Sequence, residues 1–319
     1  MRIVVLGATG HVGGYLVPRL VATGHEVVAV SRGTSEPYRA HAAWASVERV
    51  ALDRDAAEAD GTFGAQVAAL EADVVVDMIC FTVDSATHLL DALRGTGTAL
   101  VSCGTIWVHG PAVEVPITEE ARRTPSGEYG TQKAAIEELL LRESRRPGGV
   151  QSTVLHPGHI TGPGWPMINP QGNLDLGVWE ALAAGREVVL PDQGSATVHH
   201  VHADDVAQAF QLAVDRFGQA AGEAFHVVSE RAVSLRGLAE AVAREYGQEA
   251  RLRFVPFDEF RTLVSDEAGD ASWQHAWRSH SMSIEKARRL LGYAPRYTTV
   301  EAVVEGLEWL AADGRLTLR

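Results

Sequence analysis

The sequence is poor in cysteine and in long apolar runs, and each shortage excludes a class of protein. Cys80 and Cys103 offer neither a disulfide framework nor the spacing of a metal site, which fits a reducing compartment and predicts two buried thiols. No apolar run approaches the ~20 residues of a membrane-spanning helix. The IVVL run after Arg2 leads into glycines instead of a cleavage site. We therefore expect a cytoplasmic protein that has no membrane partner.

Positive charge is also scarce. The net charge is −13 and no basic run is longer than a pair, which argues against a nucleic-acid partner. Lysine occurs only at Lys133 and Lys286, so 26 of the 28 Lys and Arg residues are arginine. Arginine keeps its proton, whereas the pKa of lysine shifts readily. A lysine that persists in such a chain is therefore a candidate for a chemical role.

Short apolar runs rich in β-formers alternate with longer amphipathic stretches through the first half of the chain. This alternation predicts βαβ units and a parallel sheet with helices on both faces. A long helix is expected from about Gly127 to Arg146, and after Pro157 a loop rich in Gly, Pro and Asn begins. We predict a doubly wound α/β fold of the Rossmann type with a smaller, mostly helical C-terminal substrate domain. The dinucleotide-binding domain would comprise residues 1–165 and about 193–228, and the substrate-binding domain residues 166–192 and 229–319.

A glycine-rich segment directly follows the first predicted strand, where a helix is expected to begin. Its glycines let the chain turn tightly and let backbone N–H groups approach a pyrophosphate, which the helix dipole also favours. The position within a βαβ unit makes the pattern informative. The predicted cofactor-binding residues of this segment are Gly7, Thr9, Gly10, His11, Val12 and Gly13.

The end of the second predicted strand indicates which dinucleotide binds. NAD sites commonly place an acidic residue there for the ribose hydroxyls, but this chain has Ser31 and Arg32. An arginine with a neighbouring hydroxyl can bind a 2′-phosphate that a carboxylate would repel, so we expect NADP(H) to be preferred over NAD(H). Asp53, at the end of the third strand, is a candidate partner for the adenine amino group. An ordinary strand-end aspartate is the alternative.

Tyr129 and Lys133 lie four residues apart and therefore on one face of the predicted helix. A nearby ammonium group is expected to lower the pKa of the phenol, so that Tyr129 can exchange a proton with a substrate oxygen. Lys133 could also bind the nicotinamide ribose. Upstream, Thr105 is expected to donate a hydrogen bond to the same substrate oxygen. Ser102 is the competitor for that role.

These motifs together resemble the extended short-chain dehydrogenases/reductases, the NAD(P)-dependent epimerase/dehydratase family, over essentially the whole chain. The matching segments are the glycine motif, SCGTIWVHG (102–110), Tyr129 with Lys133, HPGHITGPG (156–164), HADDVA (202–207) and LGYAPRYT (291–298). The resemblance implies catalytic roles for Thr105, Tyr129 and Lys133. It also implies that the backbone of Pro157, Gly158 and Ile160 faces the nicotinamide. The long helices at about 84–94 and 129–146 resemble those that form homodimers in this family.

Two departures from the family pattern bear on the reaction. Ile106 and Trp107 stand where sugar dehydratases have an Asp-Glu pair, which disfavours elimination. About Val198 stands where sugar-nucleotide epimerases have a diphosphate-binding arginine, for which Arg278 is a candidate substitute. We therefore expect an oxidoreductase that reduces a carbonyl or oxidises an alcohol, with Tyr129 as general acid/base. A sugar epimerase is the alternative, and a non-catalytic dinucleotide-binding regulator ranks third.

Histidines replace the usual Tyr, Arg and Asn of the family at His109, His156 and His159. Either they are buried structural residues or one of them takes part in the chemistry. The expected contacts with a small-molecule substrate are Thr105, Trp107, Tyr129 and His159. No metal site is predicted, because strand alternation points the middle histidine of the 199, 200 and 202 set away from the other two. Several tryptophans after residue 164 indicate either an aromatic-lined second domain or ordinary core: Trp165, Trp179, Trp273 and Trp277.

Overall fold

A parallel sheet forms the larger lobe of the protein. The computed structural model describes residues 1–37 and 39–318, and within them seven strands pair in the order β11-β6-β5-β4-β1-β2-β3. Every pairing in this sheet is parallel. The strands are β1 (Arg2–Leu6), β2 (Glu26–Ser31), β3 (Glu48–Ala51), β4 (Val74–Asp77), β5 (Ala99–Cys103), β6 (Ser152–Pro157) and β11 (Ala224–Val227).

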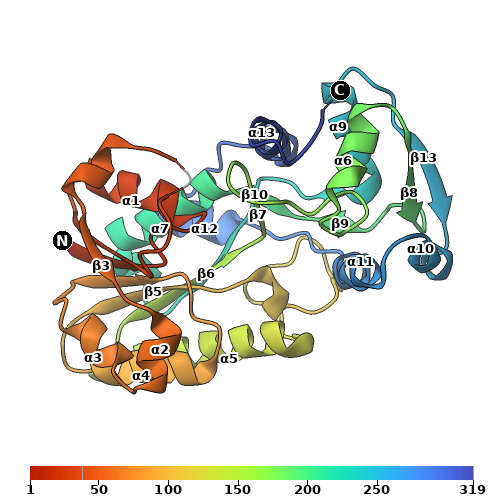
Figure 1. Cartoon of the computed structure of the whole chain (residues 1–319). Coiled ribbons are helices and arrows are strands. Elements are labelled where there is room, and N and C mark those ends of the chain that lie inside the picture. The colour runs from red at the N-terminus through yellow and green to blue at the C-terminus, as the bar shows by residue number, and fades with distance from the viewer. Residues whose placement is uncertain (38, 319) are drawn as a thin grey trace.

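Helices cover both faces of the sheet (Figure 1). One face packs against α1 (Gly13–Ala22), α7 (Ala203–Asp215), α8 (Phe217–Ala220) and α12 (Glu285–Leu291), and the other against α2 (Arg54–Ala59), α3 (Phe63–Ala68), α4 (Val83–Leu93) and α5 (Gly127–Ser144). Along β1, Ile3 and Val5 join the first hydrophobic core, whereas Val4 and Leu6 join the second. Because successive side chains of a strand point to opposite faces, the apolar run IVVL serves both cores.

A smaller lobe holds most of the C-terminal part, at the right of Figure 1. It contains a third hydrophobic core around Trp179, Leu190 and Leu307. Its helices are α6 (Leu176–Ala183), α9 (Leu235–Glu245), α10 (Phe257–Leu263), α11 (Asp266–Arg278) and α13 (Thr299–Ala312). The short strands pair as β7 (His159–Thr161) with β10 (His200–His202), β9 (Thr197–Val198) with β12 (Val233–Ser234), and β8 (Glu187–Pro191) with β13 (Arg251–Val255). Two short 3-10 helices, η1 (Ala42–Ser46) and η2 (Ile106–Val108), complete the secondary structure.

The predicted fold class is confirmed: a doubly wound parallel sheet carries a smaller, mostly helical C-terminal part. The expected helix from Gly127 ends at Ser144. The residues of α12 and the following Tyr293 pack into the first core of the sheet lobe, although they belong to the C-terminal third of the chain. The domain boundaries given above stay a prediction. No helix in the described ranges is long and apolar enough to cross a membrane.

Candidate active site

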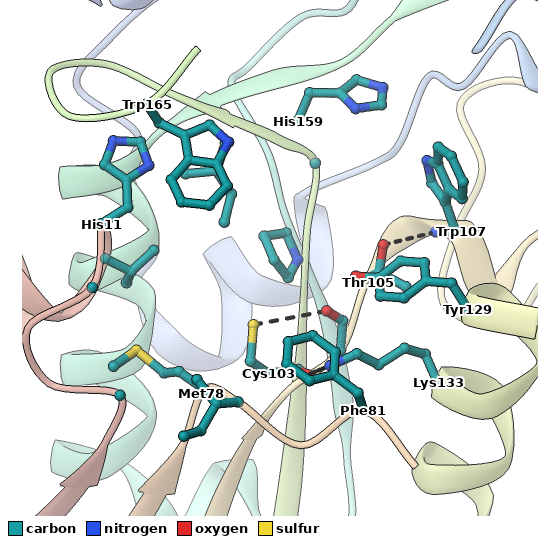
Figure 2. A pocket seen from close by; sticks show the side chains of 18 of the residues that line it. His11, Met78, Phe81, Cys103, Thr105, Trp107, Tyr129, Lys133, His159 and Trp165 are labelled. Atoms are coloured by element: carbon teal, nitrogen blue, oxygen red, sulfur yellow. Dashed lines mark hydrogen bonds between the residues drawn. The ribbon is translucent and has the colours of Figure 1, made fainter. Parts of the chain in front are cut away.

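A cavity of about 490 Å³ lies at the carboxyl ends of the central strands. In parallel sheets this edge, where neighbouring connections diverge, is the usual place of a ligand site. The lining comes from segments far apart in sequence (Figure 2): Gly7, Gly10, His11, Val12, Gly13, Met78, Ile79, Phe81, Cys103, Gly104, Thr105, Trp107, Tyr129, Lys133, Pro157, Gly158, His159, Ile160, Trp165, Pro166, Ile168 and Leu174. The fold therefore brings most of the predicted site residues together around one cavity. Its wall also contains apolar side chains that the sequence did not single out, among them Met78, Phe81 and Ile168.

The glycine loop forms one end of the cavity and fits a dinucleotide. Gly7 has a φ of +87°, which side-chain-bearing residues rarely adopt, and leads the chain from β1 into the turn. A Cβ on Gly13 would lie 2.3 Å from the Ala8 carbonyl oxygen, so only glycine permits this approach of helix and loop. No side chain in the described chain caps the first turn of α1. The Gly14, Tyr15 and Leu16 N–H groups donate to the Gly10 and Val12 carbonyl oxygens, so it is the positive end of the helix dipole, next to the glycine loop, that favours a phosphate.

Four predicted cofactor residues lie outside the cavity lining: Thr9, Ser31, Arg32 and Asp53. Ser31 ends β2, and its Oγ accepts a hydrogen bond from the Gly33 N–H at 3.3 Å. Arg32 is exposed and has no ion-pair partner among the residues the structure covers. Asp53 caps α2, with Oδ1 accepting from the Ala56 N–H at 3.2 Å. The Asp53 carboxylate thus stabilises the start of α2, which is a structural role independent of any contact with adenine.

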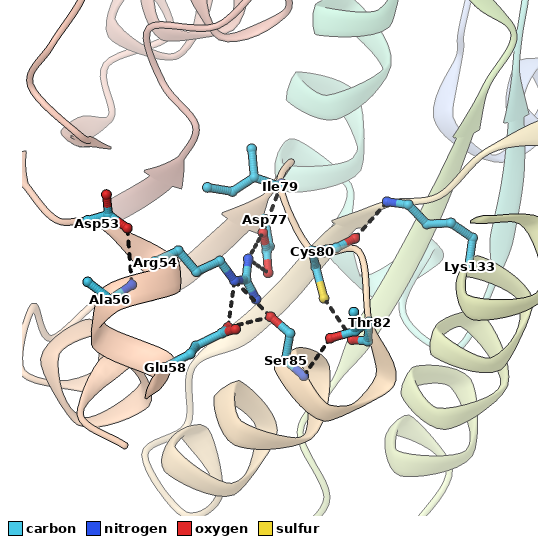
Figure 3. A network of polar contacts seen from close by, with 10 residues as sticks. All are labelled: Asp53, Arg54, Ala56, Glu58, Asp77, Ile79, Cys80, Thr82, Ser85 and Lys133. Carbon is cyan, nitrogen blue, oxygen red and sulfur yellow. Dashed lines mark hydrogen bonds and ion pairs between the residues drawn. The ribbon is translucent and has the colours of Figure 1, made fainter. Parts of the chain in front are cut away.

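Lys133 is held by two backbone carbonyls. It is 2% exposed, and its Nζ donates to the Cys80 and Cys103 oxygens at 2.7 Å each (Figures 2 and 3). These carbonyls belong to the segments that follow β4 and end β5. The ammonium group is thus fixed where two connections of the sheet meet the helix α5.

Tyr129 lies one turn earlier on α5 and borders the cavity. The side chain is 43% exposed, yet burial of its phenol group raises the pKa to about 12, with a hydrogen bond from Thr105 acting in the opposite direction. The expected lowering of the Tyr129 pKa is therefore wrong for this structure. The Lys133 ammonium group donates its hydrogen bonds to two carbonyl oxygens, and its Nζ lies 5.9 Å from the Tyr129 ring centroid. Its charge therefore does not offset the desolvation of the phenol.

Of the two candidate hydroxyls, Thr105 is the one beside Tyr129. It follows β5 and lines the cavity, and its Oγ1 accepts a hydrogen bond from the Trp107 N–H at 3.3 Å. Ser102 is buried inside β5 and does not line the cavity. Cys103 does line it and is only half-buried, which corrects the expectation of two buried thiols; Cys80 is buried as expected.

The three histidines that replace family residues have different surroundings. His156 is fully buried beneath Thr105, and its Nδ1 accepts the Thr105 N–H at 3.0 Å. A Cβ on Gly104 would lie 2.3 Å from that same nitrogen, so the glycine makes room for the ring. His109 is buried with its Nε2 2.9 Å from Nε2 of His226. Of the three, His159 alone lines the cavity.

His199, His200 and His202, which were considered above as metal ligands, each make a hydrogen bond to a different backbone group. His199 Nε2 lies 2.9 Å from the Ser229 carbonyl oxygen, and His200 Nε2 lies 3.0 Å from that of Ile168. His202 Nδ1 accepts the Asp204 N–H at the start of α7.

Two features of the site were missed in the sequence. Arg54 binds both carboxylate oxygens of buried Asp77, at 2.8 and 2.9 Å, and also Ser85 and Glu58, behind the segment that carries the Cys80 carbonyl (Figure 3). An aspartate inside the apolar run VVVDMI was the available signal, because a buried carboxylate requires a partner.

The second missed feature is a ring contact at the glycine-loop end of the cavity. The Trp165 ring stacks on His11 of the glycine loop, with centroids 5.8 Å apart and planes 9° apart (Figure 2). The other tryptophans divide between core and surface. Trp179 is fully buried in the third core, whereas Trp273 and Trp277 are partly exposed.

The fold and this cavity define a dinucleotide-binding enzyme of the short-chain dehydrogenase/reductase class. The sequence profile of the NAD dependent epimerase/dehydratase family matches residues 3–227, and the chain belongs to that family. It is accordingly an NAD(P)-dependent enzyme with a small-molecule substrate.

Relatives within the family include reductases and epimerases. The chain is 33% identical to the 2′-dehydrokanamycin reductase of Streptomyces kanamyceticus, covering 80% of this chain and 70% of that one. It is 27% identical to a UDP-glucose 4-epimerase of Mycolicibacterium smegmatis, covering 97% and 98%. Among solved structures, MoeE5 in complex with UDP-glucuronic acid and NAD shares the fold, with a TM-score of 0.71, 21% identity and coverage of 98% and 100%.

Proposed function

We propose that this chain is an NADP(H)-dependent reductase that interconverts a carbonyl compound and its alcohol. The observation that carries the proposal is the meeting of Thr105, Tyr129 and Lys133 at the end of a cavity that begins at the glycine loop. When bound there, NADPH supplies a hydride to the carbonyl carbon. The protein must then supply one proton to the oxygen.

Tyr129 is the proposed proton donor. With its pKa near 12, the phenol keeps its proton at neutral pH, as a general acid for reduction requires. Thr105 holds the substrate oxygen by a hydrogen bond and stabilises the charge that develops on it. Lys133, which its two carbonyl partners hold in place, is the proposed ligand of the cofactor ribose. Because Tyr129 is partly exposed, it can recover a proton from water.

The preference for NADP(H) rests on the end of β2. Arg32 is exposed there and unpaired among the described residues, beside the Ser31 hydroxyl. A guanidinium and a hydroxyl together match a 2′-phosphate. The further cofactor contacts we propose are Gly7, Thr9, Gly10, His11, Val12, Gly13, Asp53, Pro157, Gly158 and Ile160.

Epimerisation of a sugar is the second candidate, supported by the epimerases among the relatives. Two positions favour reduction instead. Val198 is a buried strand residue, so no cation stands there. The Arg278 guanidinium donates to Ser126 and Gln274 and stacks on Trp107. Reduction is also supported by a relative that is named 2′-dehydrokanamycin reductase.

We also propose a homodimer through α4 and α5. These two helices lie side by side on the outer face of the sheet lobe (Figure 1). Light scattering coupled to size-exclusion chromatography tests this proposal, with a mass near twice 34.2 kDa expected and a monomer contradicting it.

The test of the proposed function is NADPH oxidation, followed at 340 nm, with a panel of ketones, aldehydes and nucleotide sugars. Parallel assays use NADH at the same concentrations. Stoichiometric consumption of NADPH with formation of an alcohol supports the proposal. Conversion of a nucleotide sugar without net consumption of cofactor would contradict it and favour the epimerase.

A further inference from the structure

We infer that the substrate end of the cavity selects an uncharged, largely apolar carbonyl compound that carries a flat ring. This inference rests on the proposed function and adds the chemical class of its substrate. It follows from the charges that the cavity lacks and from the ring systems that form its wall.

The cavity wall is almost free of charge. Among the described lining residues there is no aspartate or glutamate, and Lys133 alone carries a formal charge. That ammonium is 2% exposed and already donates to two carbonyl oxygens. A substrate ammonium would meet no carboxylate here, and a substrate phosphate or carboxylate would meet no free cation. A charge that is buried without a partner is strongly disfavoured.

The histidines of the wall do not supply the missing cation. His159 lines the cavity, with the ring of His275 at 4.8 Å and that of His200 at 5.7 Å between centroids. Burial lowers the pKa of His200 and of His275 to about 4, and burial together with these neighbours lowers that of His159 well below its usual value. At neutral pH the three rings are therefore neutral.

Arg278 contacts the wall residue Trp107 but does not itself line the cavity. The Arg278 guanidinium is 1% exposed and stacks 3.9 Å from the Trp107 ring centroid. It donates to the carbonyl and side-chain oxygens of Gln274 and of Ser126. The indole therefore separates this cation from the cavity, and the cation–π contact fixes the indole in place.

Rings and apolar side chains shape the space in front of Thr105. Trp107 meets Tyr129 edge to face, with centroids 5.9 Å apart and planes at 76°. Phe81, Ile168 and Leu174 add apolar surface to the same cavity. A flat ring packs well against such a set, because aromatic pairs favour offset and edge-to-face contacts.

The test compares neutral acetophenone with two of its para-substituted derivatives, the anionic 4-acetylbenzoate and the cationic 4-(aminomethyl)acetophenone. We expect kcat/KM with NADPH for the neutral ketone to exceed that of both charged ketones by ~100-fold, since a charge that enters this cavity loses water and finds no partner of opposite charge. Binding of the same three compounds to the NADPH complex of Tyr129→Phe is measured by calorimetry. This second readout does not depend on turnover.

A charge placed on the wall supplies the matched variants. Leu174 lines the cavity and is 51% exposed, so that an acidic residue is tolerated there. Leu174→Asp should raise kcat/KM for the ammonium ketone relative to acetophenone by ~10-fold, and Leu174→Asn, which has nearly the same shape, should not.

Each outcome decides one of the two proposals. Binding of acetophenone without reduction of any carbonyl would contradict the proposed function and leave the substrate class standing. A preference of the unmodified protein for either charged ketone, or no binding of the neutral one, would overturn the substrate class.

Discussion

The two ends of the cavity are built by different means. The cofactor end is mostly backbone, formed by one short segment between β1 and α1 in which glycines allow close approach. The substrate end is mostly side chains, brought from β5, α5, the loop before α6 and the neighbouring α11. The cofactor end therefore depends on local backbone geometry, whereas the substrate end depends on packing between distant segments. Substitutions should therefore affect the two ends independently.

The largest expected effect is at the substrate end. Tyr129→Phe removes the proposed proton donor and should reduce kcat/KM by ~1,000-fold, since general acid catalysis contributes ~100- to 10,000-fold. Affinity for NADPH, measured by fluorescence titration, should change less than ~2-fold. Equal activity in the variant would remove Tyr129 from the chemistry, and loss of NADPH binding would show that the two ends are coupled.

At the cofactor end, two adjacent glycines provide a matched pair. Gly13→Ala places a Cβ 2.3 Å from the Ala8 carbonyl oxygen, whereas at Gly14 the nearest atom lies 4.0 Å away. Overpacking forces backbone shifts, and a shift of the glycine loop moves it away from the pyrophosphate, so Gly13→Ala should weaken NADPH binding by ~10-fold or more, with Gly14→Ala near the unmodified value. Calorimetric titration with NADPH measures both. Equal effects of the two substitutions would show that close approach is not what the loop requires.

Arg32→Ala sharpens the description of the cofactor end. Loss of a charge-assisted contact of ~1.5–3 kcal/mol should weaken NADPH ~10- to 100-fold and leave NADH unchanged. Arg49→Ala is the control, because Arg49 is another exposed arginine of this region but is paired with Glu36. The ratio of the two cofactor affinities is the readout. A ratio that does not change in Arg32→Ala would refute the proposed preference for NADP(H).

The last prediction concerns folding stability and the buried histidines His200, His275 and His280. His280 is buried, with its Nε2 2.9 Å from the Gly110 carbonyl oxygen. Burial lowers the pKa of His200, His275 and His280 from 6.5 to about 4. The unfolded chain therefore binds protons first as the pH falls, so stability is full above pH 6.5 and is lost between 6.5 and about 4. Each histidine contributes ~1.4 kcal/mol per pH unit within that window.

Urea unfolding at pH 8, 6.5 and 5 measures this loss. In His275→Gln the free energy of unfolding should fall less steeply between pH 6.5 and 5, by about the ~1.4 kcal/mol per pH unit that one histidine contributes. Equal free energies of unfolding at pH 8 and pH 5 would contradict the conclusion that these buried histidines are neutral in the folded protein.

Short-range sequence patterns correctly predicted the features that depend on residues close together in the chain. The alternating apolar runs gave the parallel sheet, and the spacing of Tyr129 and Lys133 placed both on one face of α5, where they border the same cavity. The direction of the Tyr129 pKa shift could not be obtained in this way, because it depends on burial and on the two carbonyls that bind Lys133.

The remaining features depend on distant partners. The ion pair of Arg54 with Asp77 joins residues 23 apart, and the stacking of Trp165 on His11 joins the loop after β7 to the glycine loop. Cys103 also became a lining residue only through the arrangement of the strands. No spacing rule reports such contacts, since they form only when the tertiary structure brings the segments together.

Transfer of deuterium tests the central claim most directly. A ketone turned over in the panel is incubated with NADPH deuterated on one or the other face of nicotinamide C4, and the product is analysed by mass spectrometry. We expect one deuterium on the new carbinol carbon from one labelled cofactor and none from the other. A product without deuterium from either cofactor, or an inverted sugar with the label still on the cofactor, would contradict it.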